Sequence, residues 1–365
     1  MYVYRVLHIT EGDAESRFRE FLRIWWEQAH LKAILAPALQ TNGTVLAARV
    51  IEDPDGLDAV NPFVPLMLSN CAAVVDEFVK DHPNGRLAVI LRPCELRTLV
   101  ELHKRNRSQL HRCYSLDREI ESEVILIGVD CPGTYHAAEF IRQVEMYGME
   151  AVIRASLNSS PAGEMVNPLP RTTCLFCEEF TPRGTALTVG SIGIAQKGHL
   201  LLIACDEDSD ASLELSESTD GLAARSQILL REAAISRIVK DRADRWADRK
   251  NTGLENFGDP VHFLASMTRC TLCADCLDAC PLYHGELSGM LGVGGDRQPK
   301  RPLLSELVEV TRWLASCSGC GMCEEACTCG VPLASLVISL SHQIRKELQY
   351  RAGDPTQPLP WGSPC

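Results

Sequence analysis

The length, composition and charge of the chain exclude several classes of protein. Its 365 residues, 45% of them hydrophobic, are enough for two or three domains with cores of their own. Lys and Arg number 36 against 48 Asp and Glu, so the chain lacks the basic excess that a nucleic-acid backbone attracts. No apolar run is long enough to span a bilayer, and the first ten residues do not form a secretory signal. We therefore expect a cytoplasmic protein with no nucleic-acid partner and no membrane span.

Helices and strands alternate in the N-terminal half. Aromatic residues at helical spacing predict an amphipathic helix over Ala14–His30. Short apolar runs predict buried parallel strands at 87–92 and 124–129, and each is followed by a helical stretch, at 96–104 and 137–145. This βαβ alternation predicts an α/β domain with a sheet covered on both faces.

Strand patterns return further along the chain and are followed by a long helix. Glycines separate three short runs that we interpret as strands, at 186–189, 192–195 and 199–204. Acidic residues make 206–220 a solvated loop or edge element, and 221–248 is interpreted as one helix. From these shifts we predict an α/β domain at 1–210, a helical connector at 211–255, a small domain at 256–350 and a flexible, proline-rich tail at 351–365.

The chain contains 17 cysteines, nine of them between Cys270 and Cys329. Disulfides do not persist in a reducing cytoplasm, so thiolates that bind metal are the better interpretation. Four cysteines have no companion at metal-ligand spacing, and we interpret these as structural thiols: Cys71, Cys113, Cys205 and Cys365.

Two cysteine runs near the C-terminus share the spacing CxxCxxCxxxC of bacterial ferredoxins, in which the fourth cysteine ligates the other cluster. Crossed ligation then predicts two [4Fe–4S] clusters. The first has the ligands Cys270, Cys273, Cys276 and Cys327, and the second has Cys280, Cys317, Cys320 and Cys323. Cys329 is an alternative to Cys327, although the spacing favours Cys327. Two complete sets exceed what a structural zinc site requires.

Four further cysteines predict a third cluster in the N-terminal domain. Cys94 and Cys131 each follow a predicted parallel strand, and the carboxyl ends of such strands share one crevice. The pair Cys174 and Cys177 would complete four thiolates. The alternative is that Cys94 and Cys131 are ordinary buried cysteines. Positive charge to stabilise the anionic cluster would come from nearby arginines, Arg92 and Arg171.

Three segments of the N-terminal half resemble signature blocks of a known family. They are Leu91–Leu102, Ile127–Thr134 and Cys174–Phe180 with the following Ala186–Gly193. The family comprises the beta subunits of deazaflavin-coenzyme-reducing hydrogenases and the related formate dehydrogenase beta subunits, and the similarity covers roughly residues 30 to 205. The C-terminal part resembles the helical dicluster domain of heterodisulfide-reductase-type subunits. Family members often place the ferredoxin part before the flavin domain, whereas here it follows.

The resemblance implies that the N-terminal α/β domain binds FAD beside the third cluster. No GxGxxG fingerprint is present, and on its own the Gly-Ser-Ile-Gly segment is most simply a turn. With the resemblance, its backbone N–H groups become candidates to bind the FAD phosphates. The residues expected to contact the flavin are Arg92, Thr134, Gly190, Ser191 and Gly193.

These features together predict an electron-transfer subunit. FAD and three [4Fe–4S] clusters would convert between two-electron flavin chemistry and one-electron transfer to other redox subunits of a hetero-oligomeric complex. One alternative is an oxidoreductase acting on a deazaflavin or NAD(P) by itself, and a second is a flavin-free, ferredoxin-like relay. The expected fold is an α/β flavin and iron–sulfur domain followed by a small, mainly α-helical, ferredoxin-like dicluster domain.

Overall fold

The protein divides into two compact units. The computed structural model describes residues 1–9, 13–40, 45–105, 122–157, 169–251, 265, 267–282 and 304–361. The first unit comprises 1–96, 109–170 and 179–240, and the second comprises 97–108, 171–178 and 241–365. The units are therefore interleaved along the chain, unlike the consecutive domains expected from the sequence. Two of the boundaries between the units fall inside helices, α3 (Pro93–Lys104) and α10 (Arg225–Asn251). The sequence at these boundaries does not have the composition of a linker.

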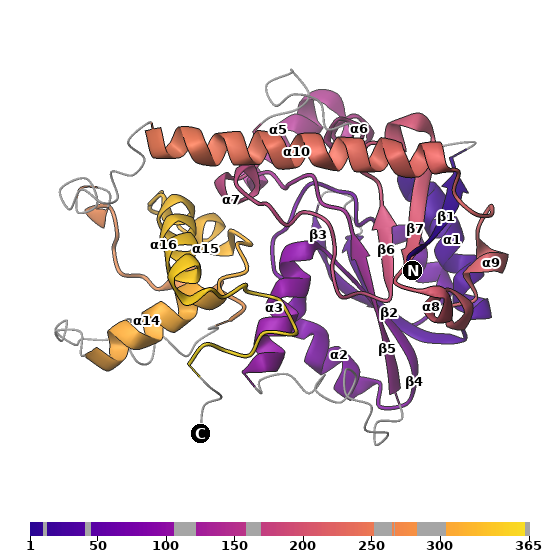
Figure 1. Ribbon diagram of the computed structural model, residues 1–365, viewed down its shortest axis with the longest axis horizontal. Coiled ribbons are helices and arrows are strands. Elements are labelled where there is room, and N and C mark those ends of the chain that lie inside the picture. The colour runs from indigo at the N-terminus through magenta and orange to yellow at the C-terminus, as the bar shows by residue number, and fades with distance from the viewer. Residues whose placement is uncertain are drawn as a thin grey trace. The chain divides into compact units, whose positions relative to one another are not determined.

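The first unit is built on a mixed sheet of seven strands (Figure 1), and its α/β class agrees with the expectation. The strand order is β1-β7-β6-β5-β4-β2-β3. Four strands, β2, β4, β5 and β6, run parallel, and antiparallel pairs flank them at both edges. The bounds are β1 Val3–His8, β2 Leu31–Leu39, β3 Leu46–Ile51, β4 Gly85–Leu91, β5 Ser122–Val129, β6 Leu187–Gly190 and β7 His199–Ala204.

Helices cover the sheet of the first unit. Helix α1 (Ala14–Gln28) begins at Asp13, whose carboxylate accepts the N–H of Ser16 at 2.7 Å. Phe21 and Trp25 stack on its buried face with ring centroids 5.9 Å apart. The remaining helices are η1 Pro54–Ala59, η2 Cys71–Val74, α2 Val75–Asp81, α5 Ala137–Tyr147, α6 Met149–Leu157, η3 Ala195–Lys197, α8 Glu207–Ser212 and α9 Leu215–Ser218, with the first part of α3 and of α10.

Alternating strand residues divide the core of the first unit between the two faces of the sheet. One face packs Ile125 and Ile127 of β5 with the aromatic side chains of α1 and with Phe140 of α5 in a single cluster. The opposite face places Leu201 and Ile203 of β7 in a second, smaller cluster. This period of two is the pattern of a sheet buried on both sides.

Some elements differ from the sequence predictions. Strands β1, β2 and β3 were not predicted, and Pro37 lies within β2 although proline disfavours strands. The predicted strand at 192–195 is instead a turn that leads into η3, because Gly193 has a φ of +76° and ends the extended backbone. The segment at 206–220 contains the short helices α8 and α9 rather than a loop.

The described part of the second unit is mainly helical. Its helices are α7 Thr172–Leu175, α12 Asp275–Asp278, α14 Leu304–Ser316, α15 Met322–Glu325 and α16 Leu333–Leu348, with the last part of α3 and of α10. Helix α14 packs against α16, and α12 against α15; α14, α15 and α16 lie together in Figure 1.

The C-terminal segment of this unit is folded as far as Trp361, unlike the flexible tail expected for 351–365. Ala352 and Leu359 are buried in a cluster with Tyr350. The N–H of Gly353 donates to Glu101 Oε1 at 2.8 Å, and the Tyr350 hydroxyl donates to the same oxygen at 2.6 Å. These apolar and polar contacts explain why a proline-rich sequence follows a defined path here.

Candidate functional site

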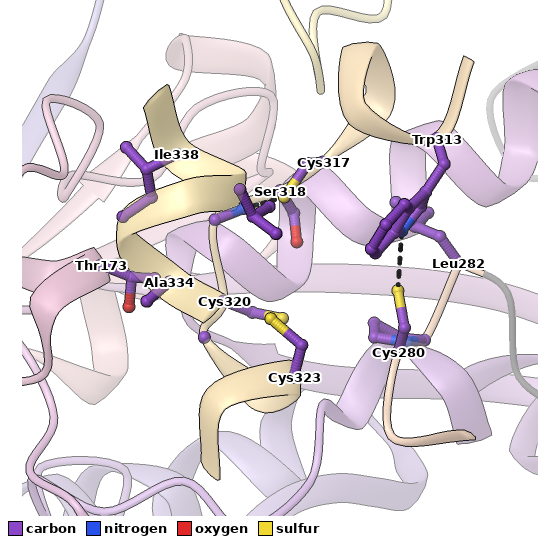
Figure 2. A pocket seen from close by; sticks show the side chains of 14 residues that line it. Thr173, Cys280, Leu282, Trp313, Cys317, Ser318, Cys320, Cys323, Ala334 and Ile338 are labelled. Carbon is purple, nitrogen blue, oxygen red and sulfur yellow. Dashed lines mark hydrogen bonds between the residues drawn. The ribbon is translucent and has the colours of Figure 1, made fainter. Parts of the chain in front are cut away.

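Four of the predicted cluster ligands line one pocket in the second unit (Figure 2): Cys280, Cys317, Cys320 and Cys323. Cys280 belongs to the first cysteine run and the other three to the second, so these are the four residues that crossed ligation assigns to one cluster. The pocket has an empty volume of about 430 Å³ including its opening to solvent. Much of its remaining wall is apolar, with Leu282, Trp313, Ala334, Val337 and Ile338.

Two glycines shape the loop that carries the second cysteine run. Gly319 and Gly321 have φ angles of +70° and +75°, in the left-handed region that favours glycine. A Cβ on Gly321 would lie 2.6 Å from Thr173 Oγ1, so a larger residue does not fit. Gly321 also precedes α15, which carries Cys323. The loop can therefore present its three thiols toward one pocket.

Helix α3 holds the same loop at Ser318. Thr98 Oγ1 donates a hydrogen bond to Ser318 Oγ at 2.8 Å, and Arg97 Nη2 donates to the Ser318 carbonyl at 2.8 Å. Ser318 and Thr98 are both buried. Ser318, which follows the candidate ligand Cys317, is thus held by two side chains of one helix, a feature that no metal-ligand motif reveals in the sequence.

The electrostatics of this pocket require a bound cation if its thiols are to ionise together. Burial raises the pKa of Cys280 to about 12, with a further increase from Cys320 and a decrease from the Trp313 hydrogen bond. Burial also raises the pKa of Cys323, and Cys317, Cys320 and Cys280 raise it further. Neighbouring thiolates thus disfavour ionisation of Cys280 and Cys323, and the iron of a bound cluster would favour it. The donor set therefore fits the expected group.

The other crossed set is also brought together. Burial raises the pKa of Cys276, and the next causes are the neighbouring thiols of Cys327, Cys270 and Cys273. The loop before Cys276 has two residues with positive φ, Leu272 at +59° and Ala274 at +71°. These two residues lie between the closely spaced cysteines of the first run and bend its backbone there.

Cys329, the alternative to Cys327, faces a different partner. Its Sγ lies 3.3 Å from Thr271 Oγ1. This hydrogen bond lowers the pKa of Cys329, and no cysteine is among the groups that shift it. The geometry therefore favours Cys327 as the fourth ligand of its set.

The four cysteines predicted for the third cluster are divided between the two units, so this ligand set stays a prediction. In the first unit, Cys94 and Cys131 follow β4 and β5, as expected. In the second unit, Cys174 lies on α7, with its Sγ 4.0 Å from Thr173 Oγ1. Cys177 Sγ accepts a hydrogen bond from Arg97 Nη2 at 3.8 Å.

The two arginines expected near this cluster are buried. Arg92 donates to the Val64 carbonyl at 2.9 Å. Although burial lowers the pKa of Arg92, the charges of Glu95, Cys131, Cys71 and Cys94 outweigh burial and raise it. The thiols of Cys94 and Cys131 therefore lie near one cation. Cys71, which has no companion in sequence, shares this environment.

Arg171 and the isolated cysteines have other surroundings. Arg171 forms an ion pair with Glu325 at 3.2 Å in the second unit. Cys205 is exposed and its Sγ lies 2.9 Å from Ser209 Oγ. Cys113 and Cys365 lie outside the described residues.

The Gly190–Gly193 loop does not fit the phosphate-binding role expected for it. The N–H groups of Ser191 and Ile192 donate to Asp130 Oδ2 at 3.1 and 3.3 Å. Asp130 is buried and pairs with Arg231 of α10 at 2.6 Å. A Cβ on Gly193 would lie 2.4 Å from Ala234 Cβ of the same helix. The Asp130 carboxylate thus already accepts the hydrogen bonds of these two amides, and α10 covers the loop. Thr134, another residue expected to contact the flavin, is also buried.

Two features are absent from the described residues. Among them, no three His, Cys, Asp or Glu side chains are arranged to hold a single metal ion. The cysteines of the pocket instead line the walls of a space larger than one ion needs. In the same described ranges, no helix combines the length and apolarity that a membrane crossing requires.

Comparisons with known proteins decide which family the chain resembles. Residues 266–331 match the family model of the 4Fe-4S dicluster domain. The F420-dependent formate dehydrogenase subunit beta of Methanocaldococcus jannaschii is 22% identical over 317 residues, which are 78% of this chain and 77% of that protein. Subunit beta of the F420-dependent formate dehydrogenase 1 of Methanococcus maripaludis is 23% identical over 328 residues, 80% of this chain and 79% of that protein. The chain resembles these beta subunits.

A solved structure shows a weaker similarity. A chain of the F420-reducing [NiFe] hydrogenase complex from Methanosarcina barkeri aligns with a TM-score of 0.46 and 11% identity, covering 70% of this chain and 94% of that chain. The curated relatives and the family model confirm the resemblance expected from the sequence. A 4Fe–4S dicluster domain therefore lies in the C-terminal region, and the protein binds 4Fe–4S clusters there.

Proposed function

We propose that this chain is an iron–sulfur electron-transfer subunit of a hetero-oligomeric redox complex. The observation that carries the proposal is the pocket in which Cys280 meets Cys317, Cys320 and Cys323. Cysteines from two separate runs converge there, as crossed ferredoxin ligation requires. Both curated relatives are named as beta subunits of F420-dependent formate dehydrogenases, which supports assembly with other subunits.

The residues of the two C-terminal sets have defined roles in this proposal. One set holds a cluster through Cys280, Cys317, Cys320 and Cys323, and the other through Cys270, Cys273, Cys276 and Cys327. A [4Fe–4S] cluster supplies one-electron transfer when bound. Gly319 and Gly321 give the ligand loop its path, Thr98 and Arg97 hold it at Ser318, and the apolar wall formed by Leu282 and Ile338 limits the access of water.

A third cluster held by Cys94, Cys131, Cys174 and Cys177 extends the proposal. The positions of Cys94 and Cys131 after parallel strands support it, and so does the cation Arg92 near both thiols. Arg97 beside Cys177 would add positive charge to the same ligand set.

The flavin chemistry is a separate part of the proposal, and it rests on the resemblance. FAD would convert between two-electron and one-electron transfer. The Gly190–Gly193 loop offers no free amides at Ser191 and Ile192, so we assign no step to that loop. Absorbance and fluorescence of the extract from denatured protein would detect a flavin, and its absence would favour the flavin-free relay.

Anaerobic purification of the tagged chain from its own host tests the central proposal. We expect iron and acid-labile sulfide in equal amounts, about twelve of each per chain for three clusters, together with stoichiometric redox subunits. An iron content near eight atoms per chain would rule out the N-terminal cluster but would leave the electron-transfer role in place. A monomer that reduced NAD(P) or a deazaflavin at full rate with a soluble dye would overturn the subunit role and favour an independent oxidoreductase.

A further inference from the structure

Trp313 of α14 forms a hydrogen bond to the sulfur of a candidate cluster ligand. Its indole Nε1 lies 3.2 Å from Cys280 Sγ, and the N–H donates to that sulfur (Figure 2). The ring packs with Cys280, Leu282 and Leu277 in one apolar cluster. Packing therefore holds the donor in place, and water does not compete freely for it.

The two cysteine sets differ in this respect. The Cys280 set receives the indole N–H at Cys280 and the backbone N–H of Gly319 at Cys317 Sγ, 3.4 Å away. Within the described ranges, no side chain donates a hydrogen bond to the sulfurs of Cys270, Cys273, Cys276 or Cys327. Hydrogen bonds to the sulfurs are one of the main determinants of the reduction potential of a [4Fe–4S] cluster. Among the described residues, the two sets therefore differ in the hydrogen bonds to their sulfurs, and such a difference can separate the reduction potentials of two clusters.

We propose that Trp313 raises the reduction potential of the cluster held by Cys280, Cys317, Cys320 and Cys323. This inference rests on the proposed function, since it requires a cluster in that pocket. Reduction adds one electron, makes no bond, and leaves the cluster with its four thiolates one unit more negative. In an apolar pocket that added charge is unfavourable, and the N–H dipole directed at Cys280 stabilises it.

The direction of the effect follows from the charge. The indole stabilises the reduced form more than the oxidised form, so its removal lowers the potential of this cluster alone. Trp313 is thus a positioning and tuning residue, not a ligand.

Trp313→Phe, followed by redox titration monitored by electron paramagnetic resonance, tests the proposal on the complete anaerobic protein. Phenylalanine keeps an aromatic ring but removes the N–H. We expect unchanged iron content and a negative shift of one midpoint potential, equivalent to roughly a three- to tenfold change in that cluster's reduction equilibrium. Trp361→Phe is the matched control, because among the described residues that ring lies beside the guanidinium groups of Arg105 and Arg312 and donates to no cysteine sulfur. Unshifted potentials, or equal shifts of all potentials, would overturn the proposal.

A measurement on the unaltered chain covers the case in which Trp313→Phe loses the cluster. Protein labelled with ¹⁵N in the indole ring is partly reduced and studied by pulsed electron–nuclear resonance. We expect a ¹⁵N coupling to one of the reduced clusters, and its absence from every reduced cluster would contradict the hydrogen bond. A protein that contains no iron would instead refute the proposed function itself.

Discussion

Single residues decide whether the two C-terminal cysteine runs are crossed. Cys280 is buried and shares its pocket with cysteines of the other run. Cys329 Sγ lies 3.3 Å from Thr271 Oγ1, and Cys329 does not line that pocket. Cys280 is the fourth cysteine of the first ferredoxin spacing, whereas Cys329 lies two residues beyond the fourth cysteine of the second.

Replacing each of them gives opposite expected results. Cys280→Ser should lower the iron content by about four atoms per chain, since one cluster loses a thiolate ligand. Cys329→Ser should keep the full iron content. Iron and sulfide assays on anaerobically purified variants measure both. Equal losses in the two variants would contradict the assignment of Cys327 over Cys329.

At the level of the element, local sequence patterns predicted the central features and missed those that depend on distant residues. Helix α1 and the parallel pair of β4 and β5 follow from periodicity and from runs of Val and Ile. Strand β2 contains Pro37, but the residue pairs antiparallel with Ala48 of β3, and that pairing cannot be seen from its own sequence. The turn after β6 depends in the same way on α10, which follows it in the chain.

The candidate site was predictable to the same extent. Spacing and crossed ligation predicted the set that now lines the pocket, because ferredoxin ligands lie close in sequence. Trp313 and Thr98 were not predictable as site residues, since neither belongs to a cysteine run. The phosphate role of Gly190–Gly193 was suggested by the family resemblance, and two of the loop's amides instead donate hydrogen bonds to Asp130.

The packing of α10 against the turn after β6 gives a prediction at this scale. Gly193 has a φ of +76°, and a Cβ there would lie 2.4 Å from Ala234 Cβ. Gly193→Ala should therefore combine backbone strain with overpacking and cost about 2–4 kcal/mol of local stability. Amide hydrogen exchange of β6 and of residues 228–236 measures this loss.

Gly184→Ala is the matched control for that variant. Gly184 has a similar φ of +68°, but a Cβ there would meet nothing within 4 Å. It should cost only the backbone part, about 1 kcal/mol. If amide hydrogen exchange increased equally in the two variants, the close contact with α10 would not contribute to stability.

At the scale of the whole molecule, the interleaved units separate residues that the sequence analysis placed in one domain. The segment with Cys174 and Cys177 belongs to the second unit. There Arg242 donates to the Cys177 carbonyl, and the Trp246 indole donates to the Phe176 carbonyl at 3.1 Å. Cys94 and Cys131 belong to the first unit, which contains the sheet. Of the four cysteines predicted for the third cluster, two thus belong to each unit.

This division makes the third cluster testable by non-additivity. If Cys131 and Cys174 hold one cluster, Cys131→Ala and Cys174→Ala should each remove about four iron atoms per chain, and the double variant should lose no more than either alone. Independent sites in two units would instead give additive losses. The control is Cys205→Ala, because Cys205 is an exposed cysteine of the first unit. This variant should retain the full iron content. Additive losses, or full iron content in both single variants, would refute the four-cysteine set, whereas equal and non-additive losses require one cluster shared by the two units.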